Sequence, residues 1–522
     1  MAADMEITMK NFFVYMTTAC LLISILMCGC GTSNTQSTDD DGEQLYEILD
    51  SDKDFAKLNT PGKQEDAYDY TSFFLPSKDG EVQPYVGDTM PYYEDGVYYI
   101  YYLKDGGDSY NHSVYLTTTT DFITYNEQDE PVLEASRNGG QDGWIGTGSV
   151  VKVDDRYYFF YTGHTNSATS EYKEKIMLAE SDNLRSFNKV ADWEITPPDE
   201  LGQKNDFRDP QAYFDSATGN ITLTITASQN NVAKILKYTL SKDLKNISYD
   251  GVIFSNTSGY DFWNLECSDT FKIEDKWYIT YSAQDDTLWY ASADEQYGPY
   301  SEAKRLEGKL FYAAKHIECD GSYYMIGWAR RSESVSSTRD VSGWGGNLLV
   351  QKISSNENDD LVLMPVDNIT KQFSARRKLL TEGTQLTAES GSLYSYYDAF
   401  NCYESFMLKG KFRYSGKGSF GLAFNYNNRQ EKYKLISISP NENKIQLSFN
   451  EGKTLISESS INISPDTEYS FTYIQEGSVG VFYIDNMAAL TVRLYGVSGK
   501  SIKLFSENNT VEFTSLKQYT KP

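Results

Sequence analysis

The sequence predicts an all-β protein, a five-bladed β-propeller followed by a C-terminal β-sandwich. Three observations predict it: long amphipathic helical periods are scarce, an aromatic-rich strand pattern occurs five times, and this recurrence stops near residue 367. Each repeat is a turn followed by a run rich in the aromatic and β-branched residues that favour pleated strands. The five repeats are Asp95–Tyr102, Asp155–Tyr161, Gly219–Ile225, Asp275–Tyr281 and Asp320–Ile326.

The spacing of the repeats predicts the propeller. Equivalent positions in neighbouring repeats lie between 46 and 64 residues apart, a period typical of propeller blades in an all-β chain. A polar turn follows each of the first three repeats, at 120–125, 181–187 and 241–247, with a weaker version at 293–300. Because Asp and Ser bond their own backbone in such turns, an outer strand is expected after each. A β-sandwich with coincidental repeats is the alternative.

Composition and strand pattern together divide the chain into four expected segments. Residues 1–30 are expected to be a lipoprotein signal peptide and residues 31–72 a polar linker and N-terminal extension. Residues 73–367 should form the propeller, which we expect to be catalytic, and residues 368–522 the sandwich. In the last segment strands alternate without the repeat motif, as at 444–449 and 479–484, and are separated by Gly and Asn turns, as expected for antiparallel sheets.

The N-terminus has the features of a secretory leader. Lys10 precedes the apolar run Phe12–Met27, which is short for a membrane span. Cys30 follows the small residue Gly29 and precedes a stretch rich in Ser, Thr and Asp, an order that resembles a bacterial lipoprotein signal. We therefore expect lipidation at Cys30 and a location on the extracellular face of the bacterial cell membrane. A plain signal peptide, which would leave the protein secreted, and an uncleaved anchor are the alternatives.

Charge and residue spacing argue against several classes of function. The formal net charge of -27 repels nucleic acid and is compatible with a neutral substrate. Outside the leader the cysteines are odd in number and far apart, and the histidines lack paired-ligand spacing, so neither a disulfide framework nor a metal or cofactor site is expected. These residues are Cys267, Cys319, Cys402, His112, His164 and His316.

Three carboxylates occupy corresponding places in the repeats. Asp88, Asp209 and Glu266 lie ten, twelve and eleven residues before one anchor residue in each of the first, third and fourth repeats. These anchor residues are Tyr98, Ile221 and Trp277. The strand before each anchor should line the central channel, so the three carboxylates are expected to meet there at one height. Repulsion and desolvation then raise at least one pKa, which yields an acid and a base for glycosidic cleavage.

Structural roles are the alternative for each acid. Asp209 precedes a proline and suits a turn, Asp88 suits a turn cap, and Glu266 suits an ion pair with Arg208. Their joint occurrence in three repeats favours catalysis. Small and aromatic side chains of the remaining repeats and residues beside the acids are suited to lining a substrate pocket. The candidate substrate-binding residues are Arg208, Trp144, Thr147, Trp263 and Tyr312.

Short motifs around these acids resemble glycoside hydrolase family 32, the β-fructosidases. Arg208-Asp209-Pro210 matches the Arg-Asp-Pro motif of the family, and Glu266-Cys267 matches Glu-Cys-Pro with Ser268 in place of proline. Gly87–Pro91 keeps the family's Asp but neither of its asparagines. The segments 144–149, 161–163, 326–328 and 344–347 resemble further motifs of the second and last blades.

The resemblance implies a fold and a mechanism. Members have a five-bladed propeller followed by a β-sandwich and cleave β-fructofuranosidic bonds in fructans or sucrose-type oligosaccharides with retention. By this likeness Asp88 is the nucleophile, Glu266 the acid/base and Asp209 the transition-state stabiliser. Retention implies carboxyl groups of the nucleophile and the acid/base about 5–5.5 Å apart. A family 43-like arabinanase or xylosidase and a non-catalytic glycan-binding surface lipoprotein are the alternatives.

Overall fold

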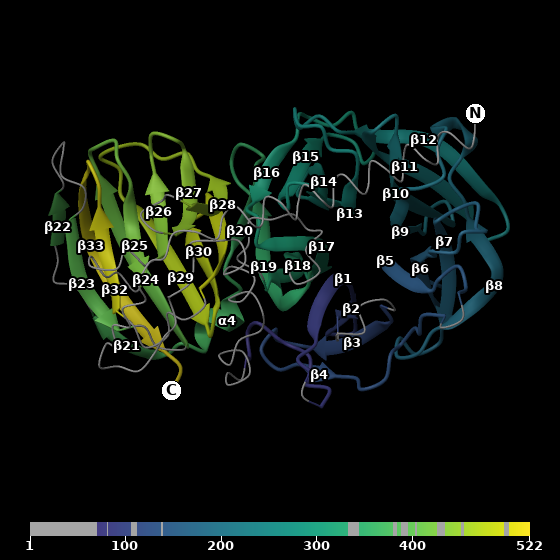
Figure 1. The fold of residues 1–522 in the computed structure, drawn as a ribbon, viewed down its shortest axis with the longest axis horizontal. Coiled ribbons are helices and arrows are strands. Elements are labelled where there is room, and N and C mark those ends of the chain that lie inside the picture. The colour runs from purple at the N-terminus through teal and green to yellow at the C-terminus, as the bar shows by residue number, and fades with distance from the viewer. Residues whose placement is uncertain are drawn as a thin grey trace, which may run out of the picture. The chain divides into compact units, whose positions relative to one another are not determined.

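The computed structural model of the chain describes residues 70–80, 82–105, 112–136, 139–331, 344–378, 384–387, 395–401, 405–424, 434–449, 454–494 and 501–522. The predicted leader, with Cys30, and nearly all of the predicted linker lie outside these ranges, as does Cys402. Within them the regular secondary structure is almost entirely strand, with one 3₁₀ turn, η1 (Asp199–Leu201), and one short helix, α4 (Asp367–Lys371) (Figure 1). The described helices lack the length and apolar character of a membrane span.

The first twenty strands form five successive antiparallel groups of four. They are β1 (Tyr85–Glu94), β2 (Val97–Asp105), β3 (Val114–Thr119), β4 (Asn126–Glu127), β5 (Trp144–Val153), β6 (Arg156–His164), β7 (Glu174–Ser181), β8 (Asn188–Ile195), β9 (Phe207–Asp215), β10 (Asn220–Gln229), β11 (Val232–Ser241), β12 (Ile247–Ser255), β13 (Leu265–Ile273), β14 (Lys276–Ala283), β15 (Leu288–Ala293), β16 (Lys304–Glu307), β17 (Phe311–Cys319), β18 (Ser322–Arg330), β19 (Gly346–Ser355) and β20 (Leu361–Met364).

The repeats found in the sequence form the second strand of each group and the turn that leads into it. The polar turns that follow are also as predicted. The Asp121 carboxylate accepts the N–H groups of Ile123 and Thr124 at 2.9 and 2.8 Å, and Asn183 does the same for the two residues that follow Leu184. Because these side chains satisfy the backbone of the turn, the chain reverses there, and the outer strands β4, β8 and β12 follow.

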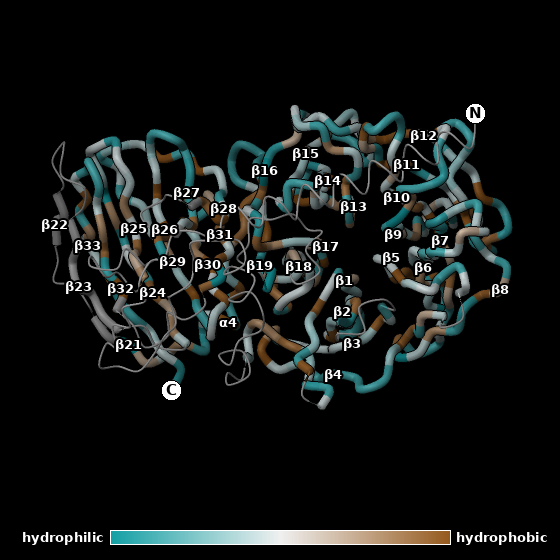
Figure 2. Tube along the Cα trace, viewed as in Figure 1, coloured by the Kyte–Doolittle hydropathy of each residue, from teal (hydrophilic) through white to brown (hydrophobic). Residues whose placement is uncertain are grey.

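The first strands of the five groups surround a common axis. In the order β1, β5, β9, β13, β17 each strand contacts the next, and β17 contacts β1 again (Figure 1). Val86 of β1 also pairs with Gly346 of β19, which joins the first group to the last. Hydrophobic residues lie along the strands and hydrophilic residues at the connecting turns (Figure 2). This cyclic order is the one that a propeller requires.

Each of these five inner strands carries a β-bulge at a corresponding place. The inner strand has one residue more than the second strand beside it, within 86–89, 146–148, 208–211, 266–269 and 312–315. Asp209, Cys267 and Ala313 take left-handed backbone angles there, with φ of 58°, 53° and 51°. Such angles cost about 1–3 kcal/mol each in a non-glycine residue, and bulges turn side chains away from the regular pleat. The bulges therefore aim side chains at the axis.

The remaining strands form two antiparallel sheets, with the orders β21-β33-β24-β29-β30-β31, where β22 also pairs with β33, and β23-β32-β25-β26-β27-β28. The two strands predicted at 444–449 and 479–484 are β27 and β30. The strands are β21 (Ala375–Lys378), β22 (Thr384–Thr387), β23 (Ser395–Asn401), β24 (Ser405–Tyr414), β25 (Phe420–Phe424), β26 (Lys434–Ser439), β27 (Lys444–Phe449), β28 (Thr454–Ser460), β29 (Tyr469–Glu476), β30 (Val479–Ile484), β31 (Ala488–Arg493), β32 (Ser501–Ser506) and β33 (Thr510–Thr520).

Aromatic side chains join the faces of these two sheets. The rings of Phe412 and Phe420 lie 5.0 Å apart, and those of Phe424 and Tyr473 lie 5.7 Å apart. Phe412 and Tyr473 belong to the first sheet and the other two to the second, so the sheets pack face to face as a sandwich.

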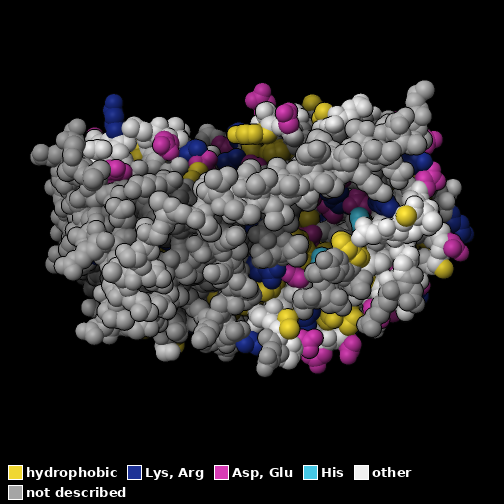
Figure 3. Space-filling view, in the orientation of Figure 1, with side chains coloured by type: hydrophobic (Ala, Val, Ile, Leu, Met, Phe, Trp, Pro, Cys, Tyr) yellow, Lys and Arg dark blue, Asp and Glu magenta, His cyan; other side chains and the backbone are white. Residues whose placement is uncertain are grey.

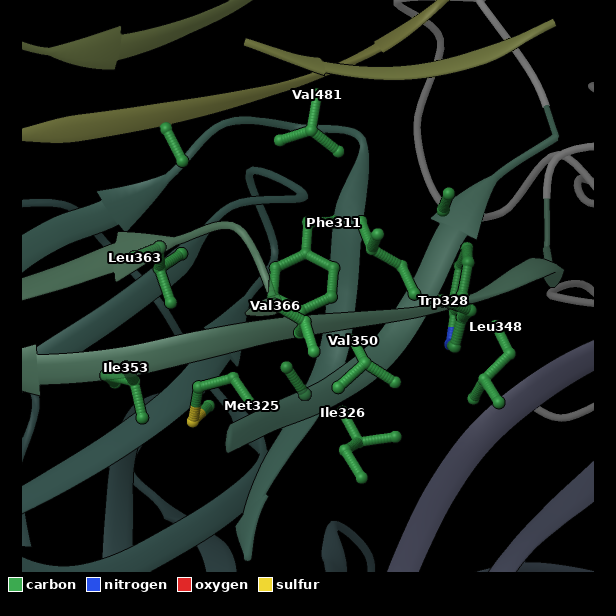
Figure 4. Packing of buried hydrophobic residues seen from close by; sticks show 14 of the residues in the cluster. Phe311, Met325, Ile326, Trp328, Leu348, Val350, Ile353, Leu363, Val366 and Val481 are labelled. Atoms are coloured by element: carbon green, nitrogen blue, oxygen red, sulfur yellow. The ribbon is translucent and has the colours of Figure 1, made fainter. Parts of the chain in front are cut away.

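The last four-strand group and the sandwich share one hydrophobic core. Phe311, Trp328 and Val350 pack in the same cluster as Val481 of β30 (Figure 4). At the start of the described chain, the Ser72 N–H and hydroxyl donate to the buried Glu476 carboxylate of β29 at 2.9 and 3.0 Å. The sandwich is thus bound both to the last group and to the segment that precedes β1.

A substitution at Gly148 can test how closely the chain is packed at the bulge of β5. A Cβ atom at this position would lie 2.2 Å from the Phe160 carbonyl oxygen, a distance that requires the backbone to move. We expect Gly148→Ala to lower the free energy of unfolding by about 1–3 kcal/mol, measured by urea denaturation. Gly143→Ala is the control, because its Cβ would meet its nearest neighbour at 3.4 Å. Equal stability of the two variants would contradict this packing.

Candidate active site

A chain of contacts brings Asp88, on β1, and Asp209, on β9, together at the bulges. The Thr147 hydroxyl lies 2.9 Å from the Asp88 carboxylate and 3.4 Å from the Cys267 sulfur. The Cys267 N–H in turn donates to the Asp209 carboxylate at 2.7 Å. Glu266, on β13, precedes Cys267, so all three predicted acids belong to one cluster around the axis.

The strand register refines their expected alignment. The sequence count predicts the three acids at one height, whereas the pairing places Glu266 immediately before its bulge and Asp209 inside its own. Glu266 is therefore level with Arg208 and Tyr312, the residues before the corresponding bulges. The three acids therefore occupy three successive positions rather than one height: Glu266 precedes its bulge, and Asp209 and Asp88 are the first and second residues inside theirs. The count from the repeats was wrong because the stretch between the bulge and the repeat differs in length from group to group.

Asp88 has two hydrogen-bond donors of its own. Besides Thr147 on Oδ2, the Trp328 indole N–H donates to Oδ1 at 3.2 Å. Burial raises the pKa of Asp88 above its ordinary value, and Glu266 nearby raises it further, while the two hydrogen bonds lower it. Both donors stabilise the ionised form of this partly buried carboxylate and so oppose the effect of burial on its pKa.

Asp209 is the most deeply buried of the three acids, at 3% exposure. Its own N–H donates to the Thr162 hydroxyl at 2.9 Å, and its side chain accepts the Cys267 N–H. Burial raises the pKa of Asp209 to about 7, although Arg208 and the Cys267 N–H act in the opposite direction. The Asp209 side chain is thus held by the backbone of β13, while its own backbone is held by Thr162 of β6.

Glu266 is more open than Asp209, with 29% of its side chain exposed. Arg208 donates to its Oε1 at 3.0 Å and the Tyr312 hydroxyl to its Oε2 at 2.5 Å. Burial and the neighbouring Glu266 raise the pKa of Tyr312 well above its usual range, so Tyr312 stays a neutral hydrogen-bond donor. Each oxygen of Glu266 therefore has a donor from a different inner strand.

Arg208 is held by further acids. Its other terminal nitrogen lies 3.2 Å from Glu174 and 3.3 Å from Asp206, and the guanidinium lies 5.8 Å from the centre of the Trp263 ring. Burial alone would raise the pKa of Glu174, but Arg208, His164 and the Phe207 N–H bring it down to about 2. Glu174 thus keeps its charge and fixes the guanidinium beside Glu266.

A buried lysine lies among these strands. Lys315, at the bulge of β17 and 1% exposed, donates to the Gly148 carbonyl at 3.0 Å and to Gln211 at 3.2 Å. It therefore ties β17 to β5 and β9, its non-neighbours in the ring. Its positive charge lowers the pKa of Asp88, opposing the effect of burial.

Four of the five predicted substrate-binding residues adjoin the acids: Thr147 binds Asp88, Tyr312 and Arg208 bind Glu266, and Trp263 lies beside Arg208. Trp144 instead packs near His164 and His112, with ring centres 5.4 and 6.5 Å away. The contacts of Trp328, Lys315 and Glu174 were not anticipated from the sequence. The fifth repeat, which leads into Ile326-Gly-Trp328, was the available signal for Trp328, whereas nothing in the spacing points to Lys315 or Glu174.

The arrangement suits acid–base and nucleophilic chemistry. Acidic, basic, hydrophobic and histidine side chains gather around a hollow on the face formed by the first twenty strands (Figure 3). The three acids have different surroundings: burial raises the pKa of Asp88 and of Asp209, and Glu266 is more exposed than Asp209. Among the described residues, no group of His, Cys, Asp and Glu side chains is placed to hold a metal ion.

The description "Glycosyl hydrolases family 32 N-terminal domain" belongs to the family model that matches residues 88–365, more than half of the chain. The chain belongs to glycoside hydrolase family 32. The match begins at Asp88 and includes the other two acids. Family and fold together imply a glycosidase. No curated protein sequence matches the chain.

Solved structures share the fold. Fructan 1-exohydrolase IIa from Cichorium intybus has a TM-score of 0.68 at 15% identity, covering 87% of this chain and 97% of its own. Sucrose-6-phosphate hydrolase from Lactobacillus gasseri has a TM-score of 0.68 at 15% identity, covering 91% and 98%. The GH32 β-fructofuranosidase from Bombyx mori has a TM-score of 0.64 at 17% identity, covering 84% and 94%.

The burial of Asp209 predicts how stability depends on pH. Its carboxyl has a pKa of about 7 when folded against an ordinary 3.8, so between these values the unfolded chain loses the proton first and stability falls as pH rises. We expect Asp209→Asn to be more stable than wild type by a margin that grows from pH 4 to pH 7. The margin should then stay constant, on the order of 2–4 kcal/mol.

Asp215→Asn, on the same strand, is the control of opposite sign. Hydrogen bonds from Thr218 and the Ala217 N–H lower the pKa of Asp215, so its ionised form stabilises the fold. This variant should be less stable than wild type at pH 7, and the difference should shrink as the pH falls. Thermal unfolding from pH 3 to pH 8 measures both. A margin for Asp209→Asn that does not change with pH would contradict the burial of its charge.

Proposed function

We propose that this chain is a retaining β-fructosidase that cleaves β-fructofuranosidic bonds in fructans or sucrose-type oligosaccharides. The observation that carries the proposal is the cluster of Asp88, Asp209 and Glu266 at the bulges of three inner strands, each with a different set of donors. Family membership supplies the reaction class, and the surroundings of each acid supply its role.

Asp88 is assigned as the nucleophile. Its carboxylate attacks the anomeric carbon of the fructosyl unit, the bond to the leaving oxygen breaks, and a covalent fructosyl-enzyme forms. The donors Thr147 and Trp328 favour the ionised form that attack requires, and Lys315 adds a positive charge. Since the resemblance was weakest at the Gly87–Pro91 segment, these contacts are the main support for the assignment.

Glu266 is assigned as the acid/base. It is the more open acid, as a group must be that protonates the leaving oxygen and then removes a proton from the incoming water. Arg208 and Tyr312 orient its two oxygens. Retention requires its carboxyl group to lie about 5–5.5 Å from that of Asp88.

Asp209 is assigned to transition-state stabilisation. Its backbone-fixed side chain is suited to binding sugar hydroxyls, in bonds that strengthen as positive charge develops on the ring. The Arg208 side chain beside it also binds sugar hydroxyls, in addition to positioning Glu266. Both residues come from the fully matched Arg-Asp-Pro motif, so this assignment has the strongest sequence support.

The solved neighbours support the substrate class. The Cichorium intybus enzyme is recorded in complex with 1-kestose, and the Bombyx mori enzyme with sucrose. Membership of family 32 disfavours the arabinanase or xylosidase alternative. We further propose that the five strand groups are the five blades of one propeller, residues 73–367, that residues 368–522 are a separate sandwich domain, and that Cys30 carries a lipid that holds the enzyme at the outer face of the membrane.

Substrate screening tests the proposal. We expect fructose or fructo-oligosaccharides to be released from levan, inulin or sucrose, and no sugar from arabinan or xylan, because the family chemistry is directed at fructofuranosides. Product analysis by chromatography measures this. Glu266→Gln is the matched inactive control: it should lose about 10²–10⁴-fold in turnover while still binding the sugar. Failure to release fructose from any of the three substrates would overturn the proposal.

Thr147→Val tests Asp88 as the nucleophile. The substitution removes a hydrogen bond that favours ionised Asp88, so the pKa of Asp88 should rise. Because the nucleophile must be ionised, activity falls as pH drops through that pKa, and the acid limb of kcat/KM should move up by about 0.5–1 pH unit. Thr165→Val, another buried threonine, is the control. An unshifted acid limb in Thr147→Val would contradict the assignment.

A further inference from the structure

One arginine of the sandwich is inserted into the last strand group. Arg493 ends β31 and is fully buried. Its Nε donates to the Arg330 carbonyl and one terminal nitrogen to the Ala329 carbonyl, both at 2.9 Å. Both terminal nitrogens also donate to Asn347 Oδ1 at 2.9 Å, and one of them to the Ser478 hydroxyl at 3.0 Å.

These contacts use all five N–H donors of the guanidinium. Four of the five bonds go to β18 and β19, which are adjacent antiparallel strands in which Ala329 pairs with Asn347. The planar guanidinium therefore fixes two successive carbonyls of β18 relative to Asn347 of β19. On the other side, the Arg330 side chain pairs with the buried Asp286 at 2.7 Å, so the end of β18 is held from both directions.

The strand that Arg493 fixes also carries a ligand of the candidate nucleophile. Trp328 directly precedes Ala329, is buried at 1% exposure, and donates its indole N–H to Asp88. Trp328, Ala329 and Arg330 are consecutive residues of one strand, so a displacement of the carbonyls of residues 329 and 330 also displaces the backbone that carries the Trp328 side chain. A shift of about 1 Å in this backbone is enough to weaken a hydrogen bond of this length.

We propose that Arg493 is a positioning residue, by which the sandwich holds Trp328 in hydrogen-bonding contact with Asp88. The sandwich is then a component of the active site rather than only a brace for the propeller. This inference rests on the proposed role of Asp88. The charged groups around Asp88 are Glu266 on β13, Asp209 on β9 and Lys315 on β17, and none of them contacts Arg493 in the hydrogen bonds described above.

Arg493→Lys tests the proposal in the full-length protein. Lysine keeps the charge, but its single ammonium group lacks the span to bind both carbonyls and Asn347 together. We expect kcat to fall about tenfold with little change in KM, because Trp328 is displaced without loss of sugar contacts. The acid limb of kcat should also move up by about 0.5 pH unit, because ionised Asp88 loses a donor. Near-UV circular dichroism and thermal unfolding confirm that the variant is folded.

Arg305→Lys is the matched control, since Arg305 also connects the two parts of the chain. It pairs with Asp285 at 2.9 Å and with Glu458 of β28 at 3.5 Å, but it does not contact β18 in these ion pairs. This variant should keep kcat and the acid limb of the wild type. If folded Arg493→Lys behaves like Arg305→Lys in both readouts, the proposal is overturned.

Two further variants keep the test decisive. Ser478→Ala removes one acceptor of Arg493 and serves if Arg493→Lys does not fold; a smaller shift of the acid limb supports the proposal and an unchanged limb overturns it. Trp328→Phe should produce the same shift, and combining it with Arg493→Lys should add little, because both changes remove one hydrogen bond. Full additivity overturns the proposal. Failure of the proposed function is seen separately, as activity that persists in Asp88→Asn.

Discussion

Burial of negative charge at the axis is the constraint on which the rest of this structure depends. Three carboxylates that leave water together repel one another, and each must be compensated by fixed donors. The donors come from different strand groups: Thr147 from β5, the Cys267 N–H from β13 and Trp328 from β18. The site therefore exists only when several strand groups are in place, and the bulges aim the groups that meet there.

The three carboxylates differ in their hydrogen-bond donors and in their exposure, and these differences suit them to different roles. Asp209 is the least exposed of the three and accepts the Cys267 N–H, which suits a group that only binds. Glu266 is more open and has one donor per oxygen, which suits a group that exchanges a proton with substrate and water. Asp88 is stabilised from two sides by neutral donors and from further away by Lys315, which suits a nucleophile.

The sequence predicted those elements in which the local residue types and the spacing of the repeats indicate the same strand or turn. The repeats predicted the second strand of every group, and the polar turns predicted the outer strands β4, β8 and β12, because both depend on local residue chemistry. The three acids were found by their place before the repeats. Their three different positions relative to the bulges were not, since a bulge has no signature in the hydrophobic pattern. Lys315 and Arg493 were also missed, because a buried cation is recognised only from the acceptors that surround it in space.

The junction of β1 and β19 has a consequence for how the protein matures. Val86 pairs with Gly346, so the strand group made first by the ribosome is completed by residues from the last group. Closing so long a loop is entropically costly and slow, and it follows rather than precedes the formation of the local hairpins. Asp88 lies two residues from this junction, and its donor Trp328 lies on the strand next to β19. A chain still emerging from the ribosome therefore lacks the assembled candidate site, whose contact between Asp88 and Trp328 joins the first strand group to the last.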